Sequence, residues 1–129
     1  MNMDFRNDDD IVSTFIEETL EHLVEIESGM LFLEDQKGTI NAELVHTMFR
    51  AAHTVKAGAN LLQAYKIETL SHALENILEL LRQEKLTLNN EIIITFLAGI
   101  DKIRELINHF ENSNDADITL LTQKLSSFQ

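Results

Sequence analysis

His53, in the segment Phe49–Lys56, is the residue of this sequence best suited to covalent chemistry. A solvent-facing imidazole is a nucleophile that can carry a phosphoryl group when one ring nitrogen is unprotonated and free to attack. On a helix, Lys56 lies one turn further along, where its ammonium could meet an oxygen of that group. Ala57 and Gly58 are small enough for another protein to approach the ring. These residues predict a phosphate carrier, and a plain surface histidine is the alternative.

His72 and Glu75 are a second polar pair that this chemistry could use. The ring nitrogen that does not attack needs a hydrogen-bond acceptor, which fixes the tautomer of the imidazole. Residues three apart share one side of a helix. The short link between the predicted helices 41–63 and 66–85 makes these helices antiparallel neighbours. We therefore expect Glu75 to reach His53 and His72 to form a second hydrogen bond nearby; otherwise both belong to a solvated helix face.

The composition favours helices as the elements that position these side chains. The 129 residues include no Pro and only four Gly, so the residues that punctuate β-hairpins are scarce. Apolar residues make up 44% of the chain, which is enough for a hydrophobic core. A chain of this length suits one domain spanning 1–129. The sequence therefore predicts a single all-α domain.

Apolar residues recur at helical spacing in five segments. Asp8–Asp10 and Asn89 or Asn90 are capping residues for the first and fourth segments, and Lys37–Gly38 is a stop signal after the first. Four long helices joined by short links favour an antiparallel up-down-up-down four-helix bundle. The fifth segment would be an additional C-terminal helix on the outside or edge of that bundle. The predicted helices span residues 10–35, 41–63, 66–85, 90–111 and 115–128.

A formal net charge of −12 narrows the classes of partner. Nucleic acid and an anionic membrane surface would both be repelled, and no basic stripe reverses the sign locally. The chain has no Cys, which excludes a disulfide framework and a thiolate site. The acidic N-terminus lacks the apolar core of a signal peptide, and the longest apolar stretch, 92–100, is about half the length of a membrane span. We expect a cytoplasmic protein that binds neither nucleic acid nor membrane.

The helical wheel of the second segment places His53 outward. At 100° per residue, His53 points roughly 160° away from the core stripe that includes Met48 and Val55. An outward ring is accessible to another protein, as phosphoryl transfer requires. The same outward face carries Phe49, Arg50, Lys56, Ala57, Asn60 and Ala64.

Three segments, Phe49–Lys56, Gly58–Ala59 and Leu70–Leu78, resemble those of histidine-containing phosphotransfer domains. The likeness is greatest to the N-terminal domains of CheA-type chemotaxis sensor kinases. It spans nearly the whole chain, and Leu86–Ile93 is similar to the start of the fourth helix in that family. The resemblance implies phosphorylation at the Nε2 atom of His53, with Lys56 beside the ring and Glu75 and His72 as its hydrogen-bonding network.

The resemblance also implies the partners. A histidine kinase ATP-binding domain would phosphorylate His53, and an aspartate of a response-regulator receiver domain would take the phosphoryl group. The sequence contains no Gly-rich nucleotide loop, so we expect no ATP site and no bound cofactor in this chain. It departs from the family at Ala57, where Gly is usual, and in 60–64, which lacks a further Gly. Docking of an acidic receiver should use uncharged residues beside the ring: Phe49, Ala57, Gly58 and Asn60.

Three other interpretations stay open. The chain could be a free-standing phosphorelay carrier rather than the first domain of a longer kinase. It could bind a divalent metal ion through His53, His72 and Glu75, although metal sites in bundles are built from inward-pointing residues. It could also be a helical interaction module without covalent chemistry. The other histidines, His22, His46 and His109, are interpreted as surface or boundary residues.

Overall fold

The computed structural model of the protein describes residues 4–36 and 40–129, and in this part of the chain every regular element is a helix. The predicted all-α class is therefore confirmed. The predicted stop at Lys37–Gly38 lies outside the described residues. The elements are the 3-10 helices η1 (Phe5–Asn7) and η2 (Phe110–Asp115) and the α-helices α1 (Asp9–Asp35), α2 (Ala42–Leu61), α3 (Tyr65–Arg82), α4 (Asn90–Asn108) and α5 (Thr119–Ser126).

Side-chain caps begin three of the four long helices. Asp8 accepts hydrogen bonds from two backbone N–H groups in the first turn of α1. Asn41 and Asn89 each accept one such bond at the starts of α2 and α4. These caps satisfy donors that the first turn of any helix leaves unpaired. The starts of α1 and α4 thus agree with the sequence prediction and have a local cause.

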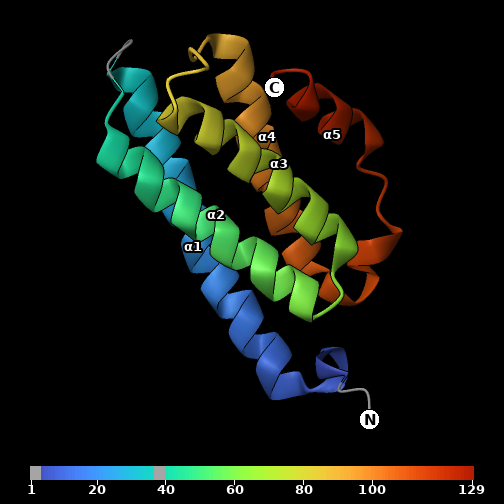
Figure 1. The fold of residues 1–129 in the computed structure, drawn as a ribbon. Coiled ribbons are helices and arrows are strands. Elements are labelled where there is room, and N and C mark those ends of the chain that lie inside the picture. The colour runs from blue at the N-terminus through green and yellow to red at the C-terminus, as the bar shows by residue number, and fades with distance from the viewer. Residues whose placement is uncertain (1–3, 37–39) are drawn as a thin grey trace.

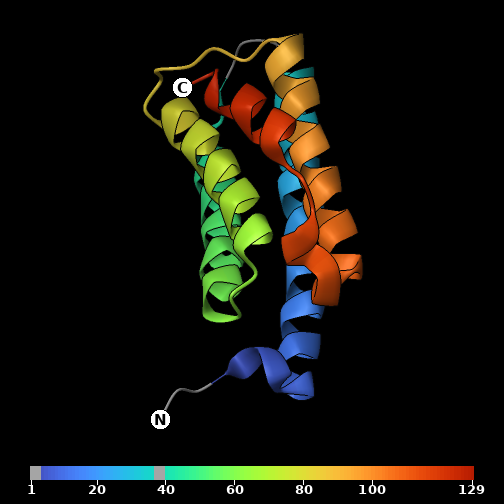
Figure 2. The same ribbon diagram turned by 90° about the vertical axis from the view of Figure 1, so that its right-hand side faces the viewer.

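Helices α1 to α4 form the predicted antiparallel up-down-up-down bundle (Figure 1). Each helix packs against the next, and α4 closes the bundle against α1. Figure 2 shows α2 beside α3 on one side and α1 beside α4 on the other. The additional C-terminal helix, α5, packs against α3 and α4 and buries Leu125 there. Helix α3 lies between α5 and α2 (Figure 1), so α5 does not cover the outer face of α2, where the candidate site lies.

Several helix boundaries in the second half of the chain differ from the prediction. The fourth helix stops at Asn108 rather than near 111, and the polar run after it forms η2 instead of a break. The last helix begins at Thr119 rather than near 115. The third stops at Arg82, three residues early, and Glu84 just beyond it has a left-handed φ of 57° that an α-helix of L-residues cannot propagate.

The turn after α2 explains why the missing glycine does not disturb the fold. Gln63 occupies the left-handed position, with a φ of 58°. The N–H of Ala64 then bonds back to the carbonyl of Ala59 at 2.8 Å, which ends the helix as a glycine would. Ala64 itself is fully buried, so its predicted place on the outward face was wrong. Ala64 lies in the turn before α3, so the direction of its side chain depends on that turn and not on the helical period of α2.

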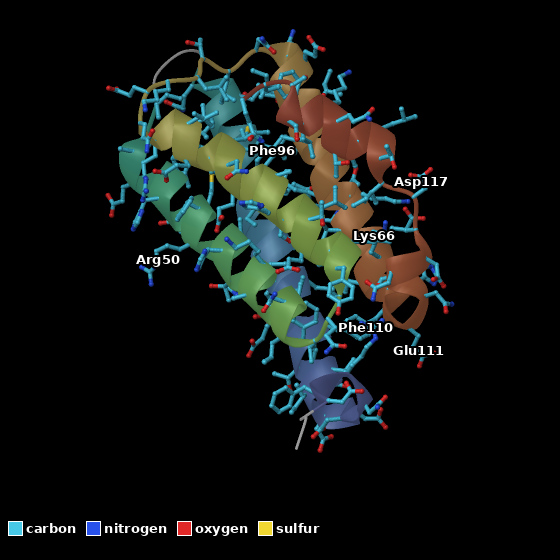
Figure 3. The ribbon with its side chains drawn as sticks, turned by 45° about the vertical axis from the view of Figure 1, so that its right-hand side comes forward. Arg50, Lys66, Phe96, Phe110, Glu111 and Asp117 are labelled. Atoms are coloured by element: carbon cyan, nitrogen blue, oxygen red, sulfur yellow. The ribbon has the colours of Figure 1, made fainter. Side chains whose placement is uncertain are left out.

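The base of the bundle is closed by the N-terminal segment. Arg6 of η1 donates hydrogen bonds to the carbonyls of Leu62 at 3.2 Å and Phe110 at 3.0 Å, and its guanidinium lies over the Phe110 ring. Figure 3 shows Phe110 and Glu111 at this end, while Phe96 of α4 lies in the core. Within residues 4–36 and 40–129, no helix combines the length and the apolar character needed to cross a membrane.

Candidate functional site

His53 lies on the exposed face of α2, as predicted. Its side chain is 57% exposed, whereas its neighbours Ala52 and Val55 are buried. Arg50, one turn earlier, projects from α2 away from the bundle (Figure 3). This alternation follows from 3.6 residues per turn, which turns one side of α2 to the core and the other to water. The imidazole is therefore accessible to a reaction partner.

Glu75 of α3 is the acceptor that the sequence predicted. Its Oε2 atom lies 2.6 Å from Nδ1 of His53. Its side chain is only 8% exposed, although the periodicity of α3 placed it away from the core stripe. Glu75 is buried because α2 packs over this side of α3. The contact joins residues 22 positions apart, and it exists only in the folded bundle.

Lys56 binds the second oxygen of the Glu75 carboxylate. Its Nζ atom donates to Oε1 of Glu75 at 2.7 Å. A carboxylate that receives two such bonds acts only as an acceptor. In the neutral imidazole of His53 the proton must then be on Nδ1, and Nε2 keeps its lone pair. The three residues thus select the tautomer in which the outer ring nitrogen is the nucleophile.

Burial and hydrogen bonding shift the pKa of Glu75 in opposite directions. Burial is the largest single effect and raises the pKa. Hydrogen bonds from Lys56 and His53, together with the positive charge of Lys56, lower the pKa and outweigh burial. The pKa of Glu75 therefore lies below its ordinary value of 4.5. Glu75 is ionised at neutral pH, as its role as an acceptor requires.

His72 does not join this network, contrary to the prediction. It is exposed on α3, and within residues 4–36 and 40–129 its ring makes no hydrogen bond. It lines a surface hollow with Lys56, Glu68 and Thr69 instead. Three residues along a helix correspond to a rotation of about 60° around the axis, so a side chain one turn from Glu75 points past α2.

Phe49 stacks on His53 rather than standing free for a partner. The two ring centroids are 6.3 Å apart and the planes are inclined by 13°. The guanidinium of Arg82, from the last turn of α3, lies over the Phe49 ring. The i, i+4 spacing of Phe49 and His53 was a usable signal for the stack. No local pattern indicated Arg82, because it comes from another helix.

The other predicted docking residues have different surroundings. Ala57 is exposed beside the site. Asn60 is also exposed, but its amide donates to Glu68 at 2.8 Å. A Cβ atom on Gly58 would lie 2.7 Å from Cε1 of Phe15 in α1. The small size of Gly58 thus serves the packing of α1 on α2, and Ala57 is the residue that leaves space for an approaching protein.

Metal binding has no support in the geometry around His53. Among the residues that the structure describes, no group of three His, Cys, Asp or Glu side chains is placed to hold a metal ion. The carboxylate nearest His53 already holds the ammonium of Lys56 at 2.7 Å, and that positive charge would repel a cation.

The model of the Hpt domain family matches residues 10–116. The chain belongs to the Hpt domain family. This Hpt domain is 32% identical over 117 residues to the chemotaxis protein CheA of Salmonella typhimurium, and 35% identical over 104 residues to CheA of Klebsiella aerogenes. The two matches cover 91% and 81% of this chain but only 17% and 16% of the relatives. The chain therefore corresponds to a small part of each CheA protein.

Solved structures of CheA phosphotransfer domains share the fold. The phosphorylated P1 domain of CheA3 from R. sphaeroides, solved in complex with CheY6, has a TM-score of 0.76 and 26% identity, with coverage of 92% of this chain and 94% of that one. The CheA phosphotransferase domain from Thermotoga maritima has a TM-score of 0.70 and 30% identity, with coverage of 78% and 93%. The resemblance inferred from the sequence is confirmed: the Hpt domain is homologous to the P1 domain of CheA.

Proposed function

We propose that His53 accepts a phosphoryl group at Nε2 and passes it to an aspartate. The observation that carries the proposal is the buried Glu75 carboxylate bound to Nδ1, which leaves the outer nitrogen of an exposed ring as the nucleophile. Membership of the Hpt family supports the same assignment. The domain contributes the nucleophile and sets its tautomer, and the partner proteins contribute the remaining catalytic groups.

Each of the two phosphoryl transfers forms one bond to phosphorus and breaks another. In the first, the Nε2 lone pair attacks the γ-phosphorus of ATP, an N–P bond forms, and the bond to the bridging oxygen breaks as ADP leaves. The proton on Nδ1 stays in place, so the phosphorylated ring is cationic, and Glu75 balances that charge. In the second, an aspartate oxygen attacks the phosphorus and the N–P electron pair returns to Nε2. Neutral His53 is regenerated.

Lys56 is proposed to offset the charge that phosphorylation adds. A phosphoryl group brings about two negative charges at neutral pH. Lys56 lies one helical turn from His53, and its side chain is 25% exposed. Its long flexible stem lets the ammonium turn from Glu75 toward the phosphoryl oxygens. We expect Lys56 to accelerate the transfer without being indispensable to it.

The proposed donor is the ATP-binding domain of a histidine kinase, and the proposed acceptor is a response-regulator receiver domain. In this proposal the chain is the N-terminal domain of a CheA-like chemotaxis kinase, acts in the cytoplasm and binds no cofactor of its own. Its likeness to CheA proteins and to a P1 domain crystallised with CheY6 supports the proposal. A free-standing carrier would use the same atoms and differ only in its surrounding chain.

The test is incubation with a CheA kinase catalytic domain and labelled ATP, followed by mapping of the modified residue. We expect one acid-labile, base-stable phosphate on His53, and none in His53→Gln with the fold unchanged. His109→Gln is the matched control, because His109 is exposed and belongs to the end of α4. Full labelling of His53→Gln would refute the assignment, and a wild-type chain without label would favour an interaction module. Tight metal binding in calorimetry that His53→Ala abolishes would favour the metal site.

A further inference from the structure

Arg82 connects α3 to the aromatic ring beside His53. Its guanidinium carbon lies 4.7 Å from the centroid of the Phe49 ring, and Phe49 stacks on His53. Two more contacts hold the guanidinium in place. Glu79 forms an ion pair with it at 2.5 Å, and Nδ1 of His46 lies 3.1 Å from Nη1. A continuous row of contacts thus runs along the α2–α3 surface and ends at the proposed phosphoacceptor.

We propose that Arg82 is a positioning residue for phosphoryl transfer and acts on His53 through Phe49. The inference rests on the proposed role of His53. Apart from its covalent bond to Cβ, the imidazole is held by Glu75 at one atom, Nδ1, so small changes of χ1 and χ2 can still tilt the ring. The stack on Phe49 restrains the plane of the ring as well. Nε2 then keeps one direction, as in-line attack on a phosphorus atom requires.

Phe49 needs support of this kind because it is only partly buried. A guanidinium over the face of an aromatic ring attracts that ring electrostatically. The planar fork of Arg82 is itself fixed by Glu79 and His46, so it restrains Phe49 better than a free side chain would. Arg82 and Glu79 are 34% and 30% exposed, and ion pairs at such positions add little to stability. The main effect of the cluster should therefore be on the orientation of the His53 ring.

Arg82 also balances the charge of Glu79, which lies one turn after Glu75 on α3. The hydrogen bond from Arg82 is the largest effect on the pKa of Glu79 and lowers it. Removal of Arg82 alone would leave the Glu79 carboxylate, one turn from Glu75, with the Gln83 amide as a donor but without a cationic partner. Removal of both partners, as in Glu79→Gln with Arg82→Gln, therefore separates the loss of the ring contact from this change of charge.

The test measures phosphorylation by a CheA kinase catalytic domain over a range of concentrations of this chain. We expect Phe49→Leu, Arg82→Gln and the Glu79→Gln/Arg82→Gln double variant to lower kcat about three- to tenfold with KM unchanged. Their thermal midpoints should stay close to that of the wild type. Phe49→Tyr keeps an aromatic ring beside His53 and should lower kcat less than Phe49→Leu does. Arg104→Gln removes a comparable surface cation, paired with Asp101 on α4, and is the matched control.

A second readout follows the ring protons of His53 by NMR. In the described structure Arg82 lies over Phe49 and Phe49 stacks on His53, so Arg82→Gln should change the ring-current shift of His53. Unchanged His53 shifts or an unchanged kcat in Arg82→Gln would overturn the inference. A rise in KM alone would overturn it too, because that is the result expected if Phe49 only docks a partner. A wild-type chain that accepts no label would instead refute the proposed phosphotransfer function, and with it the inference.

Discussion

Replacement of Glu75 by Gln should reverse the tautomer of His53. Two donors share the carboxylate, Lys56 on Oε1 at 2.7 Å and His53 on Oε2 at 2.6 Å. An amide has one acceptor atom only, and an ammonium can only donate, so Lys56 takes the amide oxygen and the NH2 group faces Nδ1. Nδ1 must then accept a hydrogen bond, and the proton moves to Nε2. The lone pair that attacks phosphorus is lost.

The size of the effect follows from the burial of Glu75. Its side chain is 8% exposed, so solvent screens the hydrogen bond to His53 only slightly. A hydrogen bond to a charged group contributes about 1.5–3 kcal/mol. The reactive tautomer must be recovered before attack, so this free energy adds to the activation barrier. Each 1.4 kcal/mol slows a reaction about tenfold, and we expect phosphorylation of Glu75→Gln to be about ten- to hundredfold slower.

The assay combines initial rates of labelling from ATP with 15N spectra of the His53 ring. Glu68→Gln is the matched control: it makes the same change on α3, where Glu68 accepts a hydrogen bond from Asn60 and not from His53. We expect a wild-type rate for Glu68→Gln and a slow rate with an Nε2–H tautomer for Glu75→Gln. A wild-type rate in Glu75→Gln, or a proton that remains on Nδ1, would show that the carboxylate does not set the nucleophile.

Three further predictions concern stability. Gly58→Ala should lower the free energy of unfolding by about 1–3 kcal/mol, because the new methyl would lie 2.7 Å from Cε1 of Phe15. Urea unfolding measures this loss, and Ala57→Ser is the control at an exposed position. Equal losses of unfolding free energy in the two variants would contradict the prediction. Gln63→Gly should raise the free energy of unfolding by about 1 kcal/mol, because Gln63 has a left-handed φ of 58°, which is unfavourable for a residue with a side chain. A lower midpoint of urea unfolding in Gln63→Gly would show that the left-handed turn stores no strain. Because the folded-state pKa of Glu75 lies below 4.5, the stability that its carboxylate provides is fully present above pH 4.5 and is lost as the pH falls through the lowered pKa. Urea unfolding at neutral and acid pH should therefore show the wild type and Glu75→Gln converging in acid, and a constant difference between them would contradict the ion-pair role.

The helices and the outward direction of His53 could be predicted because their causes are local. Caps such as Asp8 and Asn89 act on backbone groups within three residues, and amphipathic spacing decides which side of a helix faces water. Lys56 follows from the same reasoning, since residues three apart are neighbours on any helix. The bundle topology follows in turn from four such helices joined by short links.

In the second, third and fourth helices, the ends were harder to predict than the starts. Gln63 and Glu84 adopt left-handed φ values that glycine usually takes, so their residue types gave no signal. The polar run after α4 still forms the short 3-10 helix η2, because Ser113 is buried and its hydroxyl bonds the carbonyl of Phe110. These helix ends depend on how the following segment packs against the rest of the bundle, and residue type alone does not indicate that packing.

The composition of the site depended on how α3 lies against α2. The sequence determined that a nucleophilic imidazole would face water with a lysine one turn away. Only the tertiary structure decided that Glu75 and not His72 meets the ring, that Phe49 stacks on it, and that Arg82 covers Phe49. The physical reason is geometric. A small rotation or shift of α3 against α2 changes which side chains touch. The packing of the whole core determines the relative position of the two helices.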